Sequence, residues 1–272
     1  MRSVTSTDAA DWVYGITAVR HALLSGRRKV LELWVARNAR SARVLEVRSA
    51  AGDVPVREVS MKDLDRMCRG GVHQGVLAHV TPFPWSELKT LLPGEEPLLM
   101  LDGIQDPHNL GAIIRSSVAF GAKGIVLERR RSAPLSPVVA KSASGALEHV
   151  RLCRVSNLPR AIREAKEAGY WVVGARQQGG MVPWEAHVPA PVALVIGGEG
   201  SGIRPIVQKG CDLWLSIPCQ GEVKTLNASV AAAVLLYELM RRGRRGAEDP
   251  SAPGGSSREQ RQAGAMGQGA RG

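Results

Sequence analysis

Three stretches far apart in the sequence combine polar side chains with glycines at the end of an apolar run. They are LDGIQDPHNLGAIIR at 101–115, LVIGGEGSGI at 194–203 and IPCQGEVKTLNAS at 217–229. The first carries an amide and a guanidinium at Asn109 and Arg115, and the second carries one carboxylate at Glu199. Ligands of open α/β sheets bind where strands end in glycine-rich loops. We therefore predict that the three stretches contribute to a single binding site.

In the first stretch we expect Asn109 to cap a following helix and Arg115 to lie inside that helix. Arg115 has apolar neighbours at Ile113, Ile114 and Val118. A guanidinium among apolar side chains needs a hydrogen-bonding partner, and its planar set of N–H donors suits phosphate, carboxylate or ribose oxygens. The alternative interpretation is a simple cap followed by a surface charge.

The glycines of the second stretch do not form a known phosphate-binding loop. They lack the lysine of a P-loop and the glycine order of a dinucleotide-binding turn, which disfavours both functions. Gly197 and Gly198 instead indicate close backbone approach to a flat ligand, with Glu199 as the side chain offered to it. A tight turn with a solvated Glu199 is the alternative.

The third stretch runs through Thr225, Leu226 and Asn227 into an alanine-rich helix. Hydroxyl and amide side chains at a helix start satisfy free backbone N–H groups, which would be a purely structural role. Small residues at the same place also let backbone pass close to a ligand. Both interpretations stay open from the residues alone.

The composition favours a polyanionic partner. The chain has 272 residues, with 36 Lys and Arg against 25 Asp and Glu, a net charge of +11 and a pI near 10.1. Such a balance is typical of proteins that bind nucleic acid. Aromatic residues make up only 4% of the chain, so platforms that stack single-stranded bases are disfavoured.

The same composition disfavours several other classes. The four cysteines form no CxxC pair and have no histidines at zinc-site spacing, so we expect reduced thiols, a cytoplasmic location and no metal. We see no apolar core of a signal peptide at the N-terminus. The longest apolar run, near 230–240, is too short to span a bilayer, so no membrane association is expected.

Apolar periodicity predicts two α/β domains. A small one covers 13–80, with helices at 15–24, 40–50 and 61–67 and strands at 29–36, 54–59 and 76–80. A proline-containing linker follows at 81–96. Residues 97–242 alternate strands at 98–101, 124–127, 150–155, 171–174, 192–196 and 213–217 with helices at 109–120, 137–147, 158–168, 204–209 and 228–242. This alternation predicts a mostly parallel sheet covered by helices. Residues 1–12 and the Gly/Arg-rich tail at 243–272 are expected to be disordered.

The three stretches together resemble the motifs of the SpoU (TrmH) family of RNA 2′-O-ribose methyltransferases, within the SPOUT superfamily. The resembling segments are DPHNLGAIIR at 106–115, IGGEG at 196–200, and IP at 217–218 with TLNASVA at 225–231. The segments YGI at 14–16 and HQGV at 73–76 are similar to an L30e-like RNA-binding domain. KSASGALE at 141–148 agrees with the branch that methylates guanosine in ribosomal RNA.

This resemblance implies a C-terminal SPOUT domain with a trefoil knot, a methyl donor and a set of site residues. S-adenosylmethionine would be held by backbone around Gly197, Gly198, Ile217 and Leu226. Arg115 would be the central catalytic residue, clamping an RNA phosphate and stabilising the developing alkoxide. Asn109, Glu199, Thr225 and Asn227 would orient Arg115 and the ribose.

The implied substrate is a guanosine ribose in 23S ribosomal RNA, and family members are homodimers. A tRNA ribose methyltransferase shares the catalytic motifs and stays an alternative. Methylation of ribosomal RNA for antibiotic self-resistance is another. A non-catalytic RNA-binding factor for ribosome assembly is an alternative from a different class.

Overall fold

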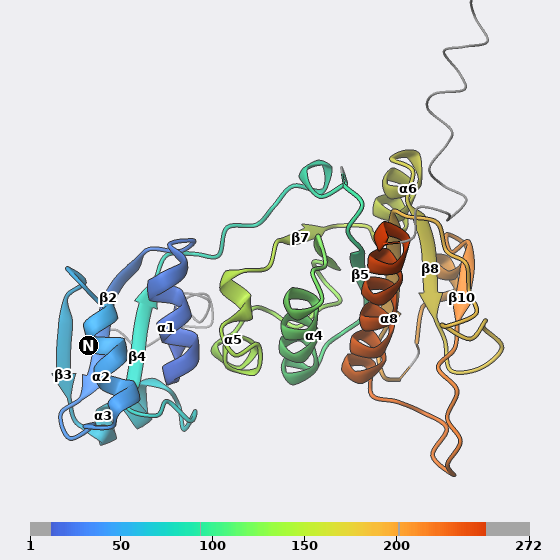
Figure 1. The fold of residues 1–272 in the computed structure, drawn as a ribbon. Coiled ribbons are helices and arrows are strands. Elements are labelled where there is room, and N and C mark those ends of the chain that lie inside the picture. The colour runs from blue at the N-terminus through green and yellow to red at the C-terminus, as the bar shows by residue number, and fades with distance from the viewer. Residues whose placement is uncertain (1–11, 93, 201, 249–272) are drawn as a thin grey trace, which may run out of the picture.

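A computed structural model describes residues 12–92, 94–200 and 202–248, and it contains two α/β domains. In Figure 1 the N-terminal domain lies at one end of the molecule, next to α5, and β10 lies at the opposite end. The predicted fold class, a small α/β domain followed by a domain built on a parallel sheet, is confirmed. None of the helices in the described residues is long and apolar enough to cross a bilayer.

The N-terminal domain is a four-stranded sheet with the strand order β1-β4-β2-β3. β1 and β2 pair antiparallel with β4, and β3 pairs parallel with β2. Its elements are β1 (Trp12–Tyr14), α1 (Ile16–Ser25), β2 (Val30–Ala36), α2 (Ala42–Ala50), β3 (Val56–Val59), α3 (Met61–Met67) and β4 (Val76–Val80). The short strand β1 was not predicted, because three residues are too few to show a period, and Trp12, predicted to be disordered, belongs to it.

The C-terminal domain contains a six-stranded sheet in which every pair is parallel, in the order β10-β8-β9-β5-β6-β7. Its strands are β5 (Leu98–Asp102), β6 (Gly124–Glu128), β7 (Leu152–Val155), β8 (Trp171–Ala175), β9 (Val192–Gly197) and β10 (Leu213–Leu215). Its helices are α4 (Pro107–Ala119), α5 (Pro137–Ser142), the 3-10 turn η3 (Ala146–Glu148), α6 (Leu158–Glu167), α7 (Pro205–Gln208) and α8 (Ala228–Glu248).

The strands of this sheet are buried on both faces, which explains their continuous apolar sequences. Along β5, Leu99 and Leu101 join the core that includes residues of α4, α5 and α8. Leu98 and Met100 point to the other face, into the core shared with α6 and α7. Side chains of a strand alternate between faces, so one short run supplies both cores.

Two helix predictions need correction. The helix predicted at 137–147 ends at Ser142, because Ser144 and Gly145 adopt positive φ angles of 52° and 88° that a right-handed helix does not contain. The last helix, predicted to end at Arg242, extends to Glu248. Gly243 therefore does not stop it, since glycine lowers helix stability without forbidding helical angles. The remainder of the predicted tail, 249–272, and residues 1–11 lie outside the described residues.

The segment predicted as a linker is packed against the C-terminal domain. Phe83 and Leu91 are buried, and a 3-10 turn η2 covers Leu88–Thr90. Ser86 donates its backbone N–H to the carbonyl of Leu152 at 2.8 Å, which ties the segment to β7. The segment that joins the two domains is thus ordered and packed against the second of them.

The junction between the domains is buried and closely packed. Arg28 forms an ion pair with Glu148, and each of these side chains is only 2% exposed. Close by, His21 Nδ1 lies 3.0 Å from His149 Nε2. Gly145 is required here, because a Cβ atom at this position would lie 2.2 Å from the His21 ring. Contacts of this kind hold α1 against η3.

Candidate active site

The candidate site lies at the carboxyl ends of β5 and β9, in the middle of the parallel sheet. From β5 the chain continues through β6 and β7 toward one edge, whereas β8, β9 and β10 occupy the other half. Between β5 and β9 the direction of winding therefore reverses. Such switch points open a crevice at the carboxyl ends of the strands, where open α/β sheets bind their ligands.

α4 begins at this edge and presents Asn109 to it. The helix starts earlier than predicted, at Pro107, and its cap is Asp106, whose Oδ1 accepts the N–H of His108 at 3.0 Å. The expectation that Asn109 caps the helix was therefore wrong. Asn109 lies within the first turn and is buried, and its amide is free to bind another segment.

A polar cluster forms around the carboxylate of Glu199. Asn109 Nδ2 donates to Glu199 Oε1, and Asn227 Nδ2 donates to the same oxygen at 2.7 Å. Asn227 also caps α8, because its Oδ1 accepts the N–H of Ser229 at 2.8 Å and the Ser229 hydroxyl at 2.6 Å. The three predicted stretches thus meet through three side chains that are far apart in sequence.

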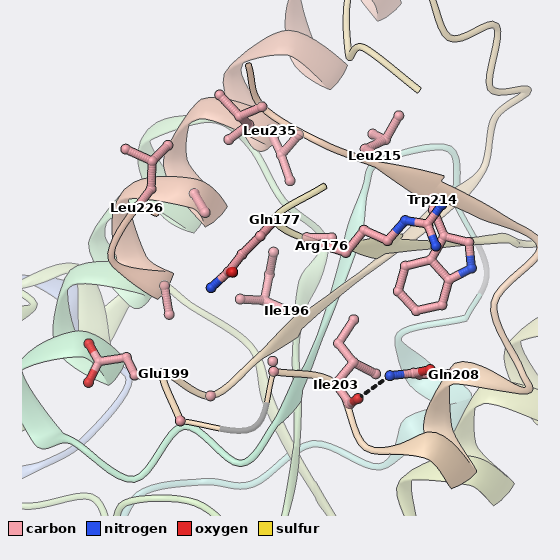
Figure 2. Close-up of a pocket in the computed structure, with 18 of the residues that line it drawn as sticks. Arg176, Gln177, Ile196, Glu199, Ile203, Gln208, Trp214, Leu215, Leu226 and Leu235 are labelled. Carbon is pink, nitrogen blue, oxygen red and sulfur yellow. Dashed lines mark hydrogen bonds between the residues drawn. The ribbon is translucent and has the colours of Figure 1, made fainter. Parts of the chain in front are cut away.

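A large pocket of about 820 Å³ opens on one side of Glu199. Its lining includes all four residues predicted to hold a cofactor, namely Gly197, Gly198, Ile217 and Leu226. Figure 2 shows Glu199 and Leu226 at one end of this pocket and Trp214 at the other, with Ile196 between them. The pocket has the size and the mixed apolar and polar lining of a small-molecule site.

Glycine is required where β9 runs into this pocket. A Cβ atom at Gly197 would lie 2.2 Å from the backbone of Gly202, and one at Gly198 would lie 2.4 Å from the carbonyl oxygen of Gly103. Neither separation is possible without moving backbone. The close approach seen here is between the protein's own loops, and the approach of these glycines to a flat ligand stays a prediction.

Several pocket residues were not predicted from the sequence. Arg176, Gln177 and Trp214 line it from the ends of β8 and β10, and the Arg176 guanidinium lies 5.2 Å from the Trp214 ring centre. Gln208 of α7 reaches back to the carbonyl of Ile203 at 2.6 Å, as the dashed line in Figure 2 shows. Arg176 and Gln177 directly follow β8, so the end of this strand was the one signal in the sequence that could have indicated them.

A second pocket of about 270 Å³ lies on the other side of the same loop. Asn109, Gln105 and Asp106 line it from the β5–α4 segment, and Gly198, Glu199 and Gly200 form the wall that it shares with the larger pocket. Glu199 therefore contributes to both pockets.

Arg115 and Thr225 are not part of the polar cluster. Arg115 is exposed on α4, while Ile113 and Ile114 are buried. The expectation that apolar neighbours surround its guanidinium was wrong, because successive helical residues point about 100° apart and sequence neighbours need not be spatial ones. Thr225 is exposed in the loop before α8. Both side chains are accessible to a large substrate.

The described part of the chain offers no metal site here, and the buried thiol of Cys211 is unreactive. No group of three or more His, Cys, Asp or Glu side chains there could hold a metal ion. Cys211 lies near the large pocket, beside Gly174, and its burial raises the pKa of the thiol to about 11. A protonated thiol is a poor nucleophile, so Cys211 is not a candidate for covalent catalysis.

Two family models match the chain. The first, described as the SpoU rRNA Methylase family, matches residues 96–237. The second, described as RNA 2′-O ribose methyltransferase substrate binding, matches residues 12–86. Together they cover both domains.

Curated relatives match over most of their length. The chain is 41% identical over 241 residues to a putative TrmH family tRNA/rRNA methyltransferase, YacO, of Bacillus subtilis, and the match covers 85% of this chain and 96% of the relative. It is 38% identical over 239 residues to the 23S rRNA (guanosine-2′-O-)-methyltransferase RlmB of Yersinia pestis, covering 85% and 97% of the two chains.

Solved structures of SpoU and TrmH/SpoU proteins are similar to this chain in fold. The SpoU methyltransferase AviRb of Streptomyces viridochromogenes, in complex with AdoMet, superposes with a TM-score of 0.72 at 26% identity and covers 86% of this chain and 90% of its own. The TrmH/SpoU tRNA modifying enzyme of A. aeolicus reaches a TM-score of 0.51 at 26% identity and covers 60% of this chain and 87% of its own.

Proposed function

The chain belongs to the SpoU rRNA Methylase family, and we propose that it methylates the 2′-hydroxyl of a guanosine ribose in 23S ribosomal RNA. Membership makes it an S-adenosylmethionine-dependent RNA methyltransferase acting on the ribose 2′-hydroxyl. The choice of ribosomal RNA is supported by the 38% identity to the 23S rRNA methyltransferase RlmB of Yersinia pestis, which extends over 85% of this chain. The tRNA-modifying relative matches only 60% of the chain. A ribosomal RNA substrate implies a cytoplasmic location, which is part of the proposal.

The large pocket fits the methyl donor. Its apolar lining at Ile196, Leu215 and Leu235 suits the flat adenine ring, and the backbone at Gly197 and Gly198 offers hydrogen-bonding groups without side chains in the way. Under the proposal Ile217 and Leu226 complete the adenosine site. When bound, S-adenosylmethionine supplies an electrophilic methyl group on a sulfonium.

The smaller pocket is the proposed place of the acceptor ribose. It shares Glu199 with the donor pocket, and the Asn109 and Asn227 amides fix the Glu199 carboxylate by donating to one of its oxygens. A fixed carboxylate beside the donor orients a hydroxyl better than a mobile one, and orientation is a large part of enzymatic rate acceleration. These three residues, together with Thr225, are assigned to positioning the ribose.

Arg115 is assigned to the RNA backbone. Its exposed guanidinium can form two parallel hydrogen bonds to a phosphate and stabilise the negative charge that develops as the 2′-hydroxyl loses its proton. Proton abstraction by Arg115 is not proposed, because a guanidinium remains protonated in proteins. The exposure of Arg115 is consistent with a partner that arrives from outside.

A homodimer is part of the proposal. Leu226, Val230, Val234 and Tyr237 are exposed on or next to α8, and the last three repeat at helical spacing along one side. A second copy of the chain would cover this apolar stripe. Light scattering is the test, with Val234→Glu as the variant that should shift a dimer to monomers, and a monomeric wild-type protein would contradict this part.

The test of function is methyl transfer from labelled S-adenosylmethionine to unmethylated 23S ribosomal RNA and, in parallel, to unmodified tRNA. Alkaline hydrolysis then identifies the product, because a 2′-O-methyl group protects the adjoining phosphodiester. We expect label in an alkali-resistant dinucleotide containing guanosine from ribosomal RNA. Label confined to tRNA would contradict the substrate assignment.

Arg115→Ala separates catalysis from binding in the same assay. Removing one group that stabilises transition-state charge lowers rates by about 10²- to 10³-fold in other enzymes, and we expect a loss of that order with the donor affinity unchanged. A ribosome-assembly factor without catalysis would keep its function after this change. Full methyl transfer by Arg115→Ala would overturn the role of this residue.

A further inference from the structure

The loop from Gly198 to Arg204 carries Glu199 and separates the two pockets, and one residue holds both of its ends. Asp102, the last residue of β5, accepts the N–H of Gly198 on its backbone carbonyl at 2.9 Å. Its carboxylate accepts the backbone N–H of Arg204 at 2.8 Å and the Arg204 Nε at 2.6 Å. Asp102 therefore contacts both ends of the loop, the first through its backbone carbonyl and the second through its carboxylate, and Gly202 donates its N–H to the Gly198 carbonyl at 3.0 Å within the loop.

The carboxylate of Asp102 is fully buried and depends on Arg204. Its side chain is 0% exposed, and a buried charge without a partner is strongly unfavourable. The Arg204 guanidinium also donates to Glu128 Oε2 at 2.6 Å, at the end of the neighbouring strand β6. Burial alone lowers the pKa of Arg204, but its hydrogen bonds and charge interactions with Asp102 and Glu128 outweigh burial and raise it.

We propose that Arg204 is a positioning residue for methyl transfer, which ties the glycine loop to Asp102 and Glu128 and so fixes Glu199 and the wall of the donor pocket. Arg204 does not line either pocket, whereas its neighbours Gly202, Ile203 and Pro205 line the larger one. Its effect is therefore exerted through the loop. The inference rests on the proposed roles of Glu199 and the large pocket.

The main test is Arg204→Gln, which removes the charge and leaves two carboxylates facing each other. We expect the dissociation constant for S-adenosylmethionine to rise about tenfold or more, measured by calorimetry on protein that is still folded. Arg160→Gln is the matched control, since it removes a guanidinium from an exposed pair with Glu164 on α6. A folded Arg204→Gln that binds the donor like the wild-type protein would overturn the inference.

A double variant distinguishes positioning from stability alone. Asp102→Asn added to Arg204→Gln should restore part of the donor affinity, since it removes the unpaired buried charge and the amide oxygen can still accept the backbone N–H of residue 204. A folded double variant that binds the donor no better than Arg204→Gln would overturn the inference.

Hydrogen exchange on the free protein gives a readout that needs no ligand. In Arg204→Gln the amides of Gly198 and Gly202 should exchange faster, while those of Val192–Ile196 in β9 should not change. If Arg204→Gln does not fold, Glu128→Gln replaces it, because that change keeps the contact between Asp102 and Arg204. We then expect a severalfold loss of donor affinity. Unchanged affinity and unchanged exchange would then overturn the inference. A wild-type protein that binds no S-adenosylmethionine would instead contradict the assigned function.

Discussion

The domain junction and the cluster around Glu199 both contain charged side chains, but in opposite surroundings. At the junction Arg28 and Glu148 are each 2% exposed, and their charged groups form an ion pair with each other. Glu199 is exposed, and its partners Asn109 and Asn227 are neutral amides that donate to one of its two oxygens. The first arrangement completes a contact within the protein.

The cluster around Glu199 leaves one carboxylate oxygen available to bind a ligand. A buried ion pair contributes to the stability of the domain arrangement, since breaking it leaves an unpaired charge. An exposed carboxylate fixed by two amides contributes little to stability but presents an oriented oxygen to a ligand. The comparison predicts that changes at the junction affect folding and changes at Glu199 affect activity.

The largest effect is expected from Glu148→Ala. It leaves Arg28 buried without its partner, which costs about 3–5 kcal/mol in the free energy of unfolding in comparable cases. Glu58→Ala is the control, because Glu58 pairs with Arg48 at 2.6 Å on the surface and such pairs contribute about 0–1 kcal/mol. Urea unfolding measures both, and equal effects of the two changes would remove the distinction between the regions.

Glu199→Ala should have a smaller effect on free energy and act on rate. Removing one positioned group typically lowers the rate by about 10- to 10²-fold, equivalent to about 1.4–2.7 kcal/mol. The unfolding free energy should change little, because Asn227 is exposed and Asn109 lines the smaller pocket, where water can replace the lost acceptor. Glu222→Ala, in the exposed loop before α8, is the control for methyl transfer. Loss of stability without loss of rate would reverse the comparison.

The smallest effect is expected from pH at the junction. Burial lowers the pKa of His21 below 6.5, and the nearby His149 and Arg20 lower it further. In the unfolded chain His21 binds a proton near pH 6.5, whereas in the folded protein it does so only at lower pH, so stability is lost as the pH falls from 6.5 through the folded pKa. Over this pH range His21→Gln should lose less stability than the wild-type protein. Urea unfolding above and below pH 6.5 measures this difference. An identical loss in the two proteins would exclude His21 as the cause.

Local sequence patterns predicted the strands and helices of both domains but not the contacts that join them. The alternation after residue 97 predicted the parallel sheet, because strands buried on both faces have a composition of their own. Asp106 and Pro107 together signal a helix start, and giving them more weight would have identified the cap that was assigned to Asn109. The bond between Asn109 and Glu199 joins residues 90 apart, and no local pattern contains it.

The segment at 141–148 shows the same limit. Its resemblance pointed to one branch of the family, and the structure shows what the residues do. Lys141 Nζ donates to the carbonyl of Val72 at 3.0 Å, and Glu148 pairs with Arg28, so both contact the N-terminal domain. The Arg28–Glu148 contact spans 120 residues of sequence. The sequence allowed the segment to be recognised, but it did not indicate that Lys141 and Glu148 contact the N-terminal domain.

The order in which the pocket residues occur along the chain has a consequence for biosynthesis. The first residue of its lining is Ala175 and the last is Leu235, on α8, so the N-terminal domain, β5, β6, β7 and most of β8 are translated before any residue of the pocket. A nascent or truncated chain that ends before α8 can bury most of β5, β6 and β7 but lacks a wall for the donor. Under the proposed assignment of the pocket, such a chain should neither retain S-adenosylmethionine nor modify RNA.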